Sequence, residues 1–204
     1  MGYYYLMAQL PYLIYGQGAP MSSRAFKGLC EEALSPADRA LLKYCTLDPE
    51  PEGSPSPGSE ELLPYQEAPL PSSSEFLDSW RNWERTLRLN LARFRSVQLK
   101  REGGGASVDP PDYPADAAAL AKAALAMDSP LEAELFLDKG RWDFIESQQG
   151  LDYFGRNTVY AYLLKLFILE RRSLFRAEEG FTEYKGLYAA IMEAAPNVEG
   201  KTDV

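Results

Sequence analysis

Apolar residues recur every three or four positions through most of this chain, which is the spacing of one face of an α-helix. The longest example runs from Ser74 to Glu102, where Trp80, Trp83, Leu87 and Phe94 fall on one stripe. The alternation of apolar and polar residues that is typical of strands is scarce. We therefore predict an all-α fold.

Serine residues mark where several helices should begin. Ser22 precedes one amphipathic segment, and Ser35 is followed by a proline and an acidic residue, a pattern that recurs from Asp128. A serine oxygen can accept a hydrogen bond from a first-turn backbone N–H, and proline suits the first helical position. The predicted helices cover residues 24–34, 36–44, 74–102, 115–127, 130 onwards, 157–179 and 181–194.

The N-terminal end is rich in tyrosine, and its secondary structure is open. Residues 3–10 fit a buried helix that Pro11 ends, and they also fit a short strand. Five of the thirteen tyrosines lie in the first fifteen residues: Tyr3, Tyr4, Tyr5, Tyr12 and Tyr15. Tyrosine buries area while keeping a polar tip. This segment therefore needs a cover, which is either the core of this chain or the surface of a partner.

Two segments interrupt the helical pattern. Residues 48–74 are acidic and contain seven prolines, so we expect an extended loop, and the glycine- and proline-rich residues 103–114 should form a linker. The predicted organisation is an N-terminal helical segment (1–47), the proline-rich loop (48–74), a long basic helix packing with the N-terminal segment (75–102), the linker (103–114), a second helical repeat (115–195) and a tail (196–204). We expect these parts to form one compact domain.

The composition excludes several classes of function. The chain has 204 residues, no histidine and a net charge of −9. Without histidine there is no Ser-His-Asp or Cys-His machinery, and the commonest transition-metal ligand is missing. Nucleic acid is disfavoured as the main partner because phosphate binding needs positive surface. The two cysteines, Cys30 and Cys45, are expected to be small buried residues, with a disulfide or a reactive thiol as the alternative.

The most apolar run, from Tyr160 to Arg176, could cross a membrane, form a core helix or bind a partner. It contains Lys165 and Glu170, and no run in the chain reaches the roughly 18 apolar residues that a bilayer requires. We therefore expect a core helix whose arginine-rich end points toward a partner. The N-terminus lacks the basic region of a secretory signal, and none is expected.

Arginines form two basic stripes in this acidic chain, one on each of the two longest predicted helices. The candidate partner-docking residues are Arg81, Arg85, Arg88, Arg171, Arg172 and Arg176. One hypothesis is an electrostatic docking face for an acidic protein. The alternative is solvated faces with salt bridges to acids elsewhere, namely Glu132, Glu134, Asp138 and Asp143. No aromatic-basic motif or glycine-rich phosphate loop supports binding to nucleic acid.

Two polar residues fall on apolar stripes. Asn90 lies on the Trp80 stripe, and Glu170 lies on the stripe of the Tyr160 helix. A buried polar group is costly unless it is paired, and such groups often fix the register between helices. For Glu170 we expect a partner on another helix, such as Arg85 or Arg88. No second carboxylate or base completes a catalytic set, so no enzyme activity, cofactor or small-molecule substrate is expected.

Part of the second half resembles the C subunit of the archaeal A-type ATPase, whose eukaryotic V-type counterpart is the d subunit. The similar segments are LEAELFLDKGRWDFIES at residues 131–147 and YFGRNTVYAYLLKLFILERRSLFR at residues 153–176. The matching positions are Phe154, Gly155, Ala161, Tyr162, Leu163, Glu170, Arg172 and Leu174. The helix carrying Trp80 is similar to an earlier repeat of that family through Asp78, Asn82 and Arg85. The N-terminal YYYLMAQLPYL and the two helices after it resemble a short bacterial family encoded among V-type ATPase subunits.

This resemblance implies a bundle of pseudo-repeated long helices, like that of the C and d subunits. It implies a non-catalytic protein that couples the central stalk of a V/A-type ATPase, a proton or sodium transporter, to the membrane rotor ring. The partners would be other subunits of that ATPase, and the protein would sit on the cytoplasmic face of the inner membrane through protein contacts. The alternative is a general helical adaptor or regulatory scaffold that captures partners through its acidic loop.

Overall fold

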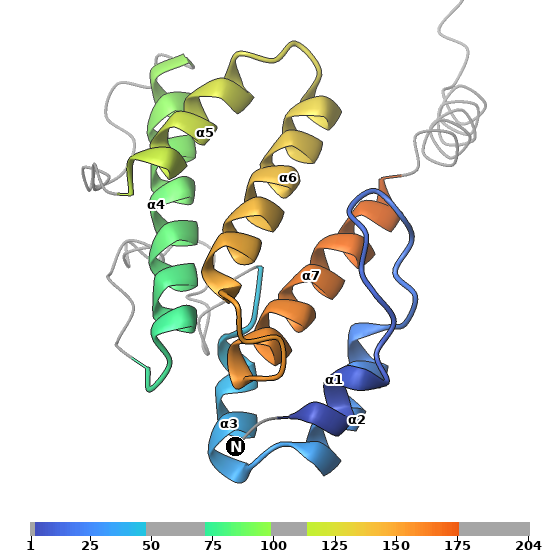
Figure 1. Cartoon of the computed structure of the whole chain (residues 1–204). Coiled ribbons are helices and arrows are strands. Elements are labelled where there is room, and N and C mark those ends of the chain that lie inside the picture. The colour runs from blue at the N-terminus through green and yellow to red at the C-terminus, as the bar shows by residue number, and fades with distance from the viewer. Residues whose placement is uncertain (1–2, 48–71, 99–113, 176–204) are drawn as a thin grey trace, which may run out of the picture. The chain divides into compact units, whose positions relative to one another are not determined.

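The structure is a computed structural model of the chain, and it describes residues 3–47, 72–98 and 114–175 (Figure 1). The chain divides into two compact units, Met1–Arg172 and Ser173–Val204, and only residues 173–175 of the second unit are described. The helices are α1 (Tyr4–Ala8), α2 (Ser23–Ala33), α3 (Pro36–Leu41), the 3-10 helix η1 (Leu42–Tyr44), α4 (Glu75–Gln98), α5 (Ala115–Leu125), α6 (Pro130–Gln149) and α7 (Arg156–Leu174). The described residues contain no strand, which confirms the all-α prediction for this part of the chain.

Three helices begin at the serines that the sequence indicated. The Oγ atoms of Ser22, Ser35 and Ser129 accept hydrogen bonds from backbone N–H groups three residues later, at 3.1, 3.2 and 3.3 Å. α3 and α6 carry proline at their first positions, where no N–H is needed. Each cap satisfies a donor that would otherwise lack an intrahelical partner.

The N-terminal residues adopt the helical alternative and not the strand. α1 spans five residues, and the N–H of Tyr3, just before it, donates to the carbonyl of Phe154 at 2.6 Å. The ring of Tyr4 stacks on Phe154 with centroids 3.8 Å apart. The start of the chain is thus tied to the turn before α7, about 150 residues away in sequence.

The apolar stripe of α4 faces the core over most of its length. Trp80, Trp83 and Leu87 are buried, Phe94 is half-buried, and Val97 is 69% exposed, so the stripe leaves the core near the end of the described helix. α5 packs against α4 and α6. The indole N–H of Trp83 donates to Asp116 on α5 at 2.9 Å. The ring of Trp83 also stacks on Phe144 of α6, with centroids 4.6 Å apart.

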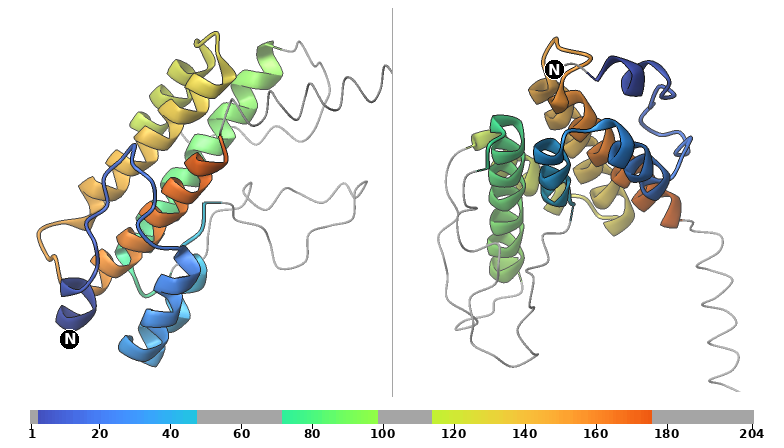
Figure 2. Two further views of the ribbon diagram at one scale, coloured as in Figure 1. Left: turned by 90° about the vertical axis from the view of Figure 1, so that its right-hand side faces the viewer. Right: turned by 90° about the horizontal axis from the view of Figure 1, so that it is seen from below.

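α6 and α7 are consecutive long helices that run in opposite directions (Figures 1 and 2). α6 ends at Gly150, whose φ of 71° is a conformation that favours glycine. Earlier in α6, Gly140 lets α5 approach closely, because a Cβ atom there would lie 2.4 Å from Cδ2 of Leu120. One glycine therefore permits the helix contact, and the other permits the turn.

The central helix is α7. Every residue from Thr158 to Leu164 is buried, so no side of this half of the helix faces solvent. Figure 2 shows the N-terminal segment lying along α7, and the hydroxyl of Tyr162 donates to the carbonyl of Pro11 at 2.9 Å. The prediction of a core helix is confirmed here, whereas Leu174 at its end is 81% exposed. Among the described residues, no helix has the length and apolar character to cross a bilayer.

Several predictions lie outside the described residues. These are most of the proline-rich loop, the linker to residue 113, the helix at 181–194, the tail and the docking candidate Arg176.

Candidate functional site

The two described arginines at the end of α7 contact groups within the chain. Nη2 of Arg171 is hydrogen-bonded to Oδ1 of the buried Asp138. Arg172 lies over the ring of Tyr15, 4.5 Å from the centroid, and donates to its hydroxyl at 2.7 Å. The hydroxyl of Tyr15 in turn donates to the carbonyl of Leu135 at 2.7 Å. These contacts attach the loop between α1 and α2 to α6 and α7.

The predicted docking arginines on α4 are also close to internal groups. The guanidinium of Arg81 lies over the ring of Tyr44, 4.5 Å from the centroid. Nε of Arg88 donates to Glu84 at 2.9 Å, and its Nη2 donates to the carbonyl of Leu47. Arg85 is half-buried. A docking role for these arginines stays a prediction, and a partner would meet Arg81 and Arg88 side chains that already contact groups of this chain.

Each of the two polar residues on apolar stripes is hydrogen-bonded to a backbone group. Asn90 is 4% exposed, and its amide donates to the carbonyl of Thr86 one turn earlier, at 2.9 Å. Oε1 of the half-buried Glu170 accepts from the N–H of Ser23 at 2.6 Å. Ser23 is the first residue of α2, where a negative charge is favourable. Arg88, one of the two expected partners of Glu170, pairs with Glu84.

A group of charged side chains, which we call the charge cluster, joins α4, α6 and α7. Its members are Arg88, Glu84, Arg141, Asp138 and Arg171. Both oxygens of Glu84 accept from Arg141, from Nε and Nη2, at 2.9 Å each. Nη1 of Arg141 reaches Oδ1 of Asp138 at 3.2 Å. Glu84, Asp138 and Arg141 are at most 4% exposed, so removing one of them would leave a buried charge without its partner.

Two members of this cluster, Glu84 and Arg141, were not among the residues predicted from the sequence. Glu84 lies four residues after Trp80 and three before Leu87, which puts it on the apolar stripe of α4. Arg141 follows Leu137 by four residues, which puts it on the buried face of α6. The helical spacing could have identified both as buried charges. It could not identify them as partners, because they are 57 residues apart.

The salt-bridge alternative for the basic stripes is confirmed for two of its four acids, Asp138 and Glu134. Arg171 pairs with Asp138, whereas Asp143 pairs with Lys139, which lies on α6 outside both stripes. Arg95 lies 3.8 Å from Glu134, and both of these side chains are largely exposed. Exposed pairs of this kind contribute little to stability, about 0–1 kcal/mol each.

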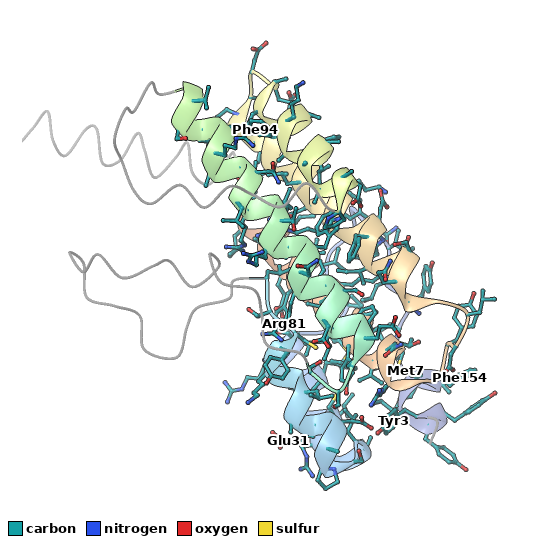
Figure 3. The ribbon with its side chains drawn as sticks, turned by 90° about the vertical axis from the view of Figure 1, so that its left-hand side faces the viewer. Tyr3, Met7, Glu31, Arg81, Phe94 and Phe154 are labelled. Carbon is teal, nitrogen blue, oxygen red and sulfur yellow. The ribbon has the colours of Figure 1, made fainter. Side chains whose placement is uncertain are left out.

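A second feature is a pocket of about 430 Å³ beside the α6–α7 turn, with exposed side chains on α1, on the segment after it and on the turn. We call the exposed side chains there the aromatic surface: Tyr4, Tyr5, Tyr12, Leu151 and Tyr153 are between 61% and 94% exposed. The pocket itself is lined by Met7 and Phe154, which Figure 3 labels at this end of the molecule, and by Tyr12 and Tyr153. Tyrosine-rich exposed surface is typical of protein interfaces.

Lys165 supplies the positive charge of this pocket. Its Nζ donates to Glu146 at 3.2 Å and to Gln149 at 3.4 Å, and lies 5.0 Å from the ring centroid of Trp142. Burial lowers the pKa of this amine, and the nearby Glu146 carboxylate only partly offsets the effect.

The two cysteines are free and buried, as the sequence indicated. Burial raises the pKa of the Cys30 thiol to about 12, and burial also raises the pKa of Cys45. Both thiols are therefore protonated near neutral pH and behave as small apolar side chains. In the described ranges, no group of three or more cysteine, aspartate and glutamate residues is arranged to hold a metal ion.

Comparison with known proteins gives no match: no protein-family model, no curated protein and no solved structure is similar to this chain.

Proposed function

We propose that this chain is a non-catalytic rotor-coupling component of a V/A-type ATPase, which links the central stalk of the soluble head to the membrane rotor ring. The observation that carries the proposal is the resemblance of residues 131–147 and 153–176 to the C and d subunits. These residues form nearly all of α6 and α7. The proposal also includes two features of that family: a bundle of pseudo-repeated long helices, and a location on the cytoplasmic face of the inner membrane.

The physical properties of α6 and α7 suit such a role. A component that transmits torque needs helices that resist bending and sliding. Residues Thr158 to Leu164 of α7 are all buried, and α6 is joined to α4 by the two-oxygen contact between Arg141 and Glu84. Charged groups that are fully paired inside a protein resist rearrangement, because any shift exposes an unpaired charge to the apolar interior.

A general helical adaptor is the second candidate function. The aromatic surface favours it, since exposed tyrosines beside a pocket can hold many kinds of protein partner. The acidic residues 48–74 would be a further binding element in such an adaptor. The two functions predict different partners and a different response to deletion of residues 50–71.

Affinity capture tests the proposal. The tagged full-length chain would be recovered from gently solubilised membranes, and its companions identified by mass spectrometry. We expect subunits of the ATPase head, stalk and ring, in amounts that moderate salt reduces because exposed charges take part. Deleting residues 50–71 should leave this recovery unchanged.

Two results would count against a role in rotor coupling. Recovery of the folded chain alone would remove the ATPase role. Recovery of other proteins that depends on residues 50–71 would establish the adaptor in its place.

A further inference from the structure

A pocket of about 290 Å³ opens between α4, α6 and α7, next to the charge cluster. Four arginines contribute to its wall: Arg88, Arg95, Arg141 and Arg171. Among the described residues that line it, the one acidic residue is Glu134. Glu84 and Asp138, which are buried, pair with three of these arginines, so the four guanidinium groups exceed the three nearby carboxylates by one charge in a chain whose net charge is −9.

The arginines differ in exposure, which gives the pocket a floor and a rim. The side chain of Arg141 is 5% exposed and forms the floor. Arg171 and Arg88 are 21% and 25% exposed, and Arg95 is 55% exposed. Glu134, at 40%, lies at the rim with Arg95. A ligand that enters would therefore meet one exposed guanidinium before it reaches the partly buried ones.

Two of these guanidinium groups are not fully hydrogen-bonded by the described residues. Nε of Arg171 is buried and has no hydrogen-bond partner in the part of the chain that the structure describes, although Nη2 of the same side chain bonds to Asp138. Arg95 lies 3.8 Å from Glu134, which is too long for a hydrogen bond. A buried donor without a partner is costly, and an oxygen ligand would remove that cost once a small shift of Arg171 admits it to Nε.

We infer that this pocket binds the carboxylate of a glutamate or aspartate side chain from a partner protein. The choice of a protein as the ligand rests on the proposed function. A guanidinium matches a carboxylate through two parallel N–H···O bonds. Arg141 and Glu84 form this arrangement at the floor of the same pocket. Glu134 at the rim disfavours a more highly charged phosphate group, because like charges repel at short range.

Two charge reversals on one helix test the inference. Arg95→Glu changes the rim of the pocket, whereas Arg93→Glu makes the same change two residues away at an exposed position that is not in the pocket wall. Neither residue belongs to the buried charge cluster, so both variants should fold. Arg171→Lys is a third variant that keeps the charge and removes the unpartnered Nε–H.

The probe is a fluorescein-labelled peptide of alternating glycine and glutamate, and binding to the full chain is measured by fluorescence polarisation at physiological salt. The matched peptide carries glutamine in place of glutamate. We expect Arg95→Glu and Arg171→Lys each to weaken binding of the glutamate peptide about tenfold or more, the loss of one charge-assisted hydrogen bond. We expect Arg93→Glu to weaken it less than about twofold, because salt screens exposed charges beyond roughly 8 Å.

Three results would overturn the inference. One is equal binding of the glutamate and glutamine peptides. Another is an equal loss in Arg95→Glu and Arg93→Glu, which would indicate general attraction to the net charge. The third is displacement of the peptide by millimolar inorganic phosphate, which would assign the pocket to phosphate groups. Failure of the proposed function looks different: the peptide still binds in the pocket while affinity capture recovers no ATPase subunit.

Discussion

The two sides of α7 are held by different chemistry. On the side of the N-terminal segment, the hydroxyls of Tyr160 and Tyr162 donate to the backbone carbonyls of Asp38 and Pro11, at 3.1 and 2.9 Å. On the side of α6, Arg171 reaches the buried Asp138, and Lys165 pairs with Glu146. One helix therefore has a tyrosine-rich interface, which also carries a partly exposed ion pair between Arg156 and Asp38, and an interface that contains a buried ionic contact.

This difference determines how each interface should respond to change. A neutral hydrogen bond between a hydroxyl and a carbonyl contributes about 0.5–1.5 kcal/mol, and neighbouring bonds are largely independent. The ionic side depends on all members of the charge cluster, because Arg141 alone holds both Glu84 and Asp138. Removing one charge leaves others buried without compensation. On the tyrosine side, each substitution should lower the free energy of unfolding by a small, separate amount. On the ionic side, a single substitution should cause a large loss.

The largest effect is expected at Arg141. Arg141→Leu should lower the free energy of unfolding by about 3–5 kcal/mol, because Glu84 and Asp138 would stay buried without that guanidinium. Urea denaturation measures the change. Lys139→Leu is the control on the same helix, because its ion pair with Asp143 is half-exposed and should contribute less than about 1 kcal/mol. Equal losses in the two variants would show that the buried cluster does not stabilise the bundle.

A smaller effect is expected on the tyrosine side. Tyr160→Phe and Tyr162→Phe should each cost about 1 kcal/mol, since each removes one hydroxyl donor from a backbone carbonyl. Burial raises the pKa of Tyr162 to about 12 and also raises the pKa of Tyr160, so both hydroxyls keep their protons at neutral pH. Tyr5→Phe is the control, because Tyr5 is 94% exposed and should change nothing measurable.

The same denaturation experiment shows whether the tyrosine contacts are independent. We expect the double variant with phenylalanine at both positions to lose the sum of the two single effects. A much larger loss would mean that the two hydroxyls act together, and the contrast with the ionic side would disappear.

The smallest effect is a pH dependence at Asp38. Burial of this carboxyl would raise its pKa, but hydrogen bonds from Tyr3 and Ser35 and the positive charge of Arg156 outweigh burial and lower it. A lowered pKa in the folded state stabilises the protein above the ordinary aspartate value of about 3.9, and this stability is lost as the pH falls through the folded value. The ion pair between Asp38 and Arg156 is partly exposed and should contribute about 1 kcal/mol or less.

The variant Asp38→Asn isolates this contribution. The difference in unfolding free energy between the wild type and the variant should be constant from pH 7 to about pH 5 and should shrink as the pH falls below about 4. Denaturation curves at closely spaced pH values measure it. A difference that does not change with pH would show that Asp38 contributes only as a hydrogen-bond acceptor, without its charge.

The sequence predicted the elements of the fold better than it predicted the site. The helix starts at Ser22, Ser35 and Ser129 could be predicted from the sequence, because a cap is a local arrangement of about four residues. The all-α class followed from the helical spacing of apolar positions. The contact between Glu170 and Ser23 could not be predicted, since the two residues are 147 positions apart and the contact is to the backbone N–H of Ser23, which no side-chain pattern encodes.

What the sequence determined by itself was local: which segments are helical, where several of them begin, and which faces are apolar. Periodicity and capping depend on residues that are only a few positions apart, so both can be recognised in the amino-acid sequence. The tertiary structure decided which charges meet. Glu84 and Arg141 are 57 residues apart, and only the packing of α4 against α6 brings them within 2.9 Å. The same packing decides which arginines are buried as partners and which, like Arg95, remain at the rim of a pocket.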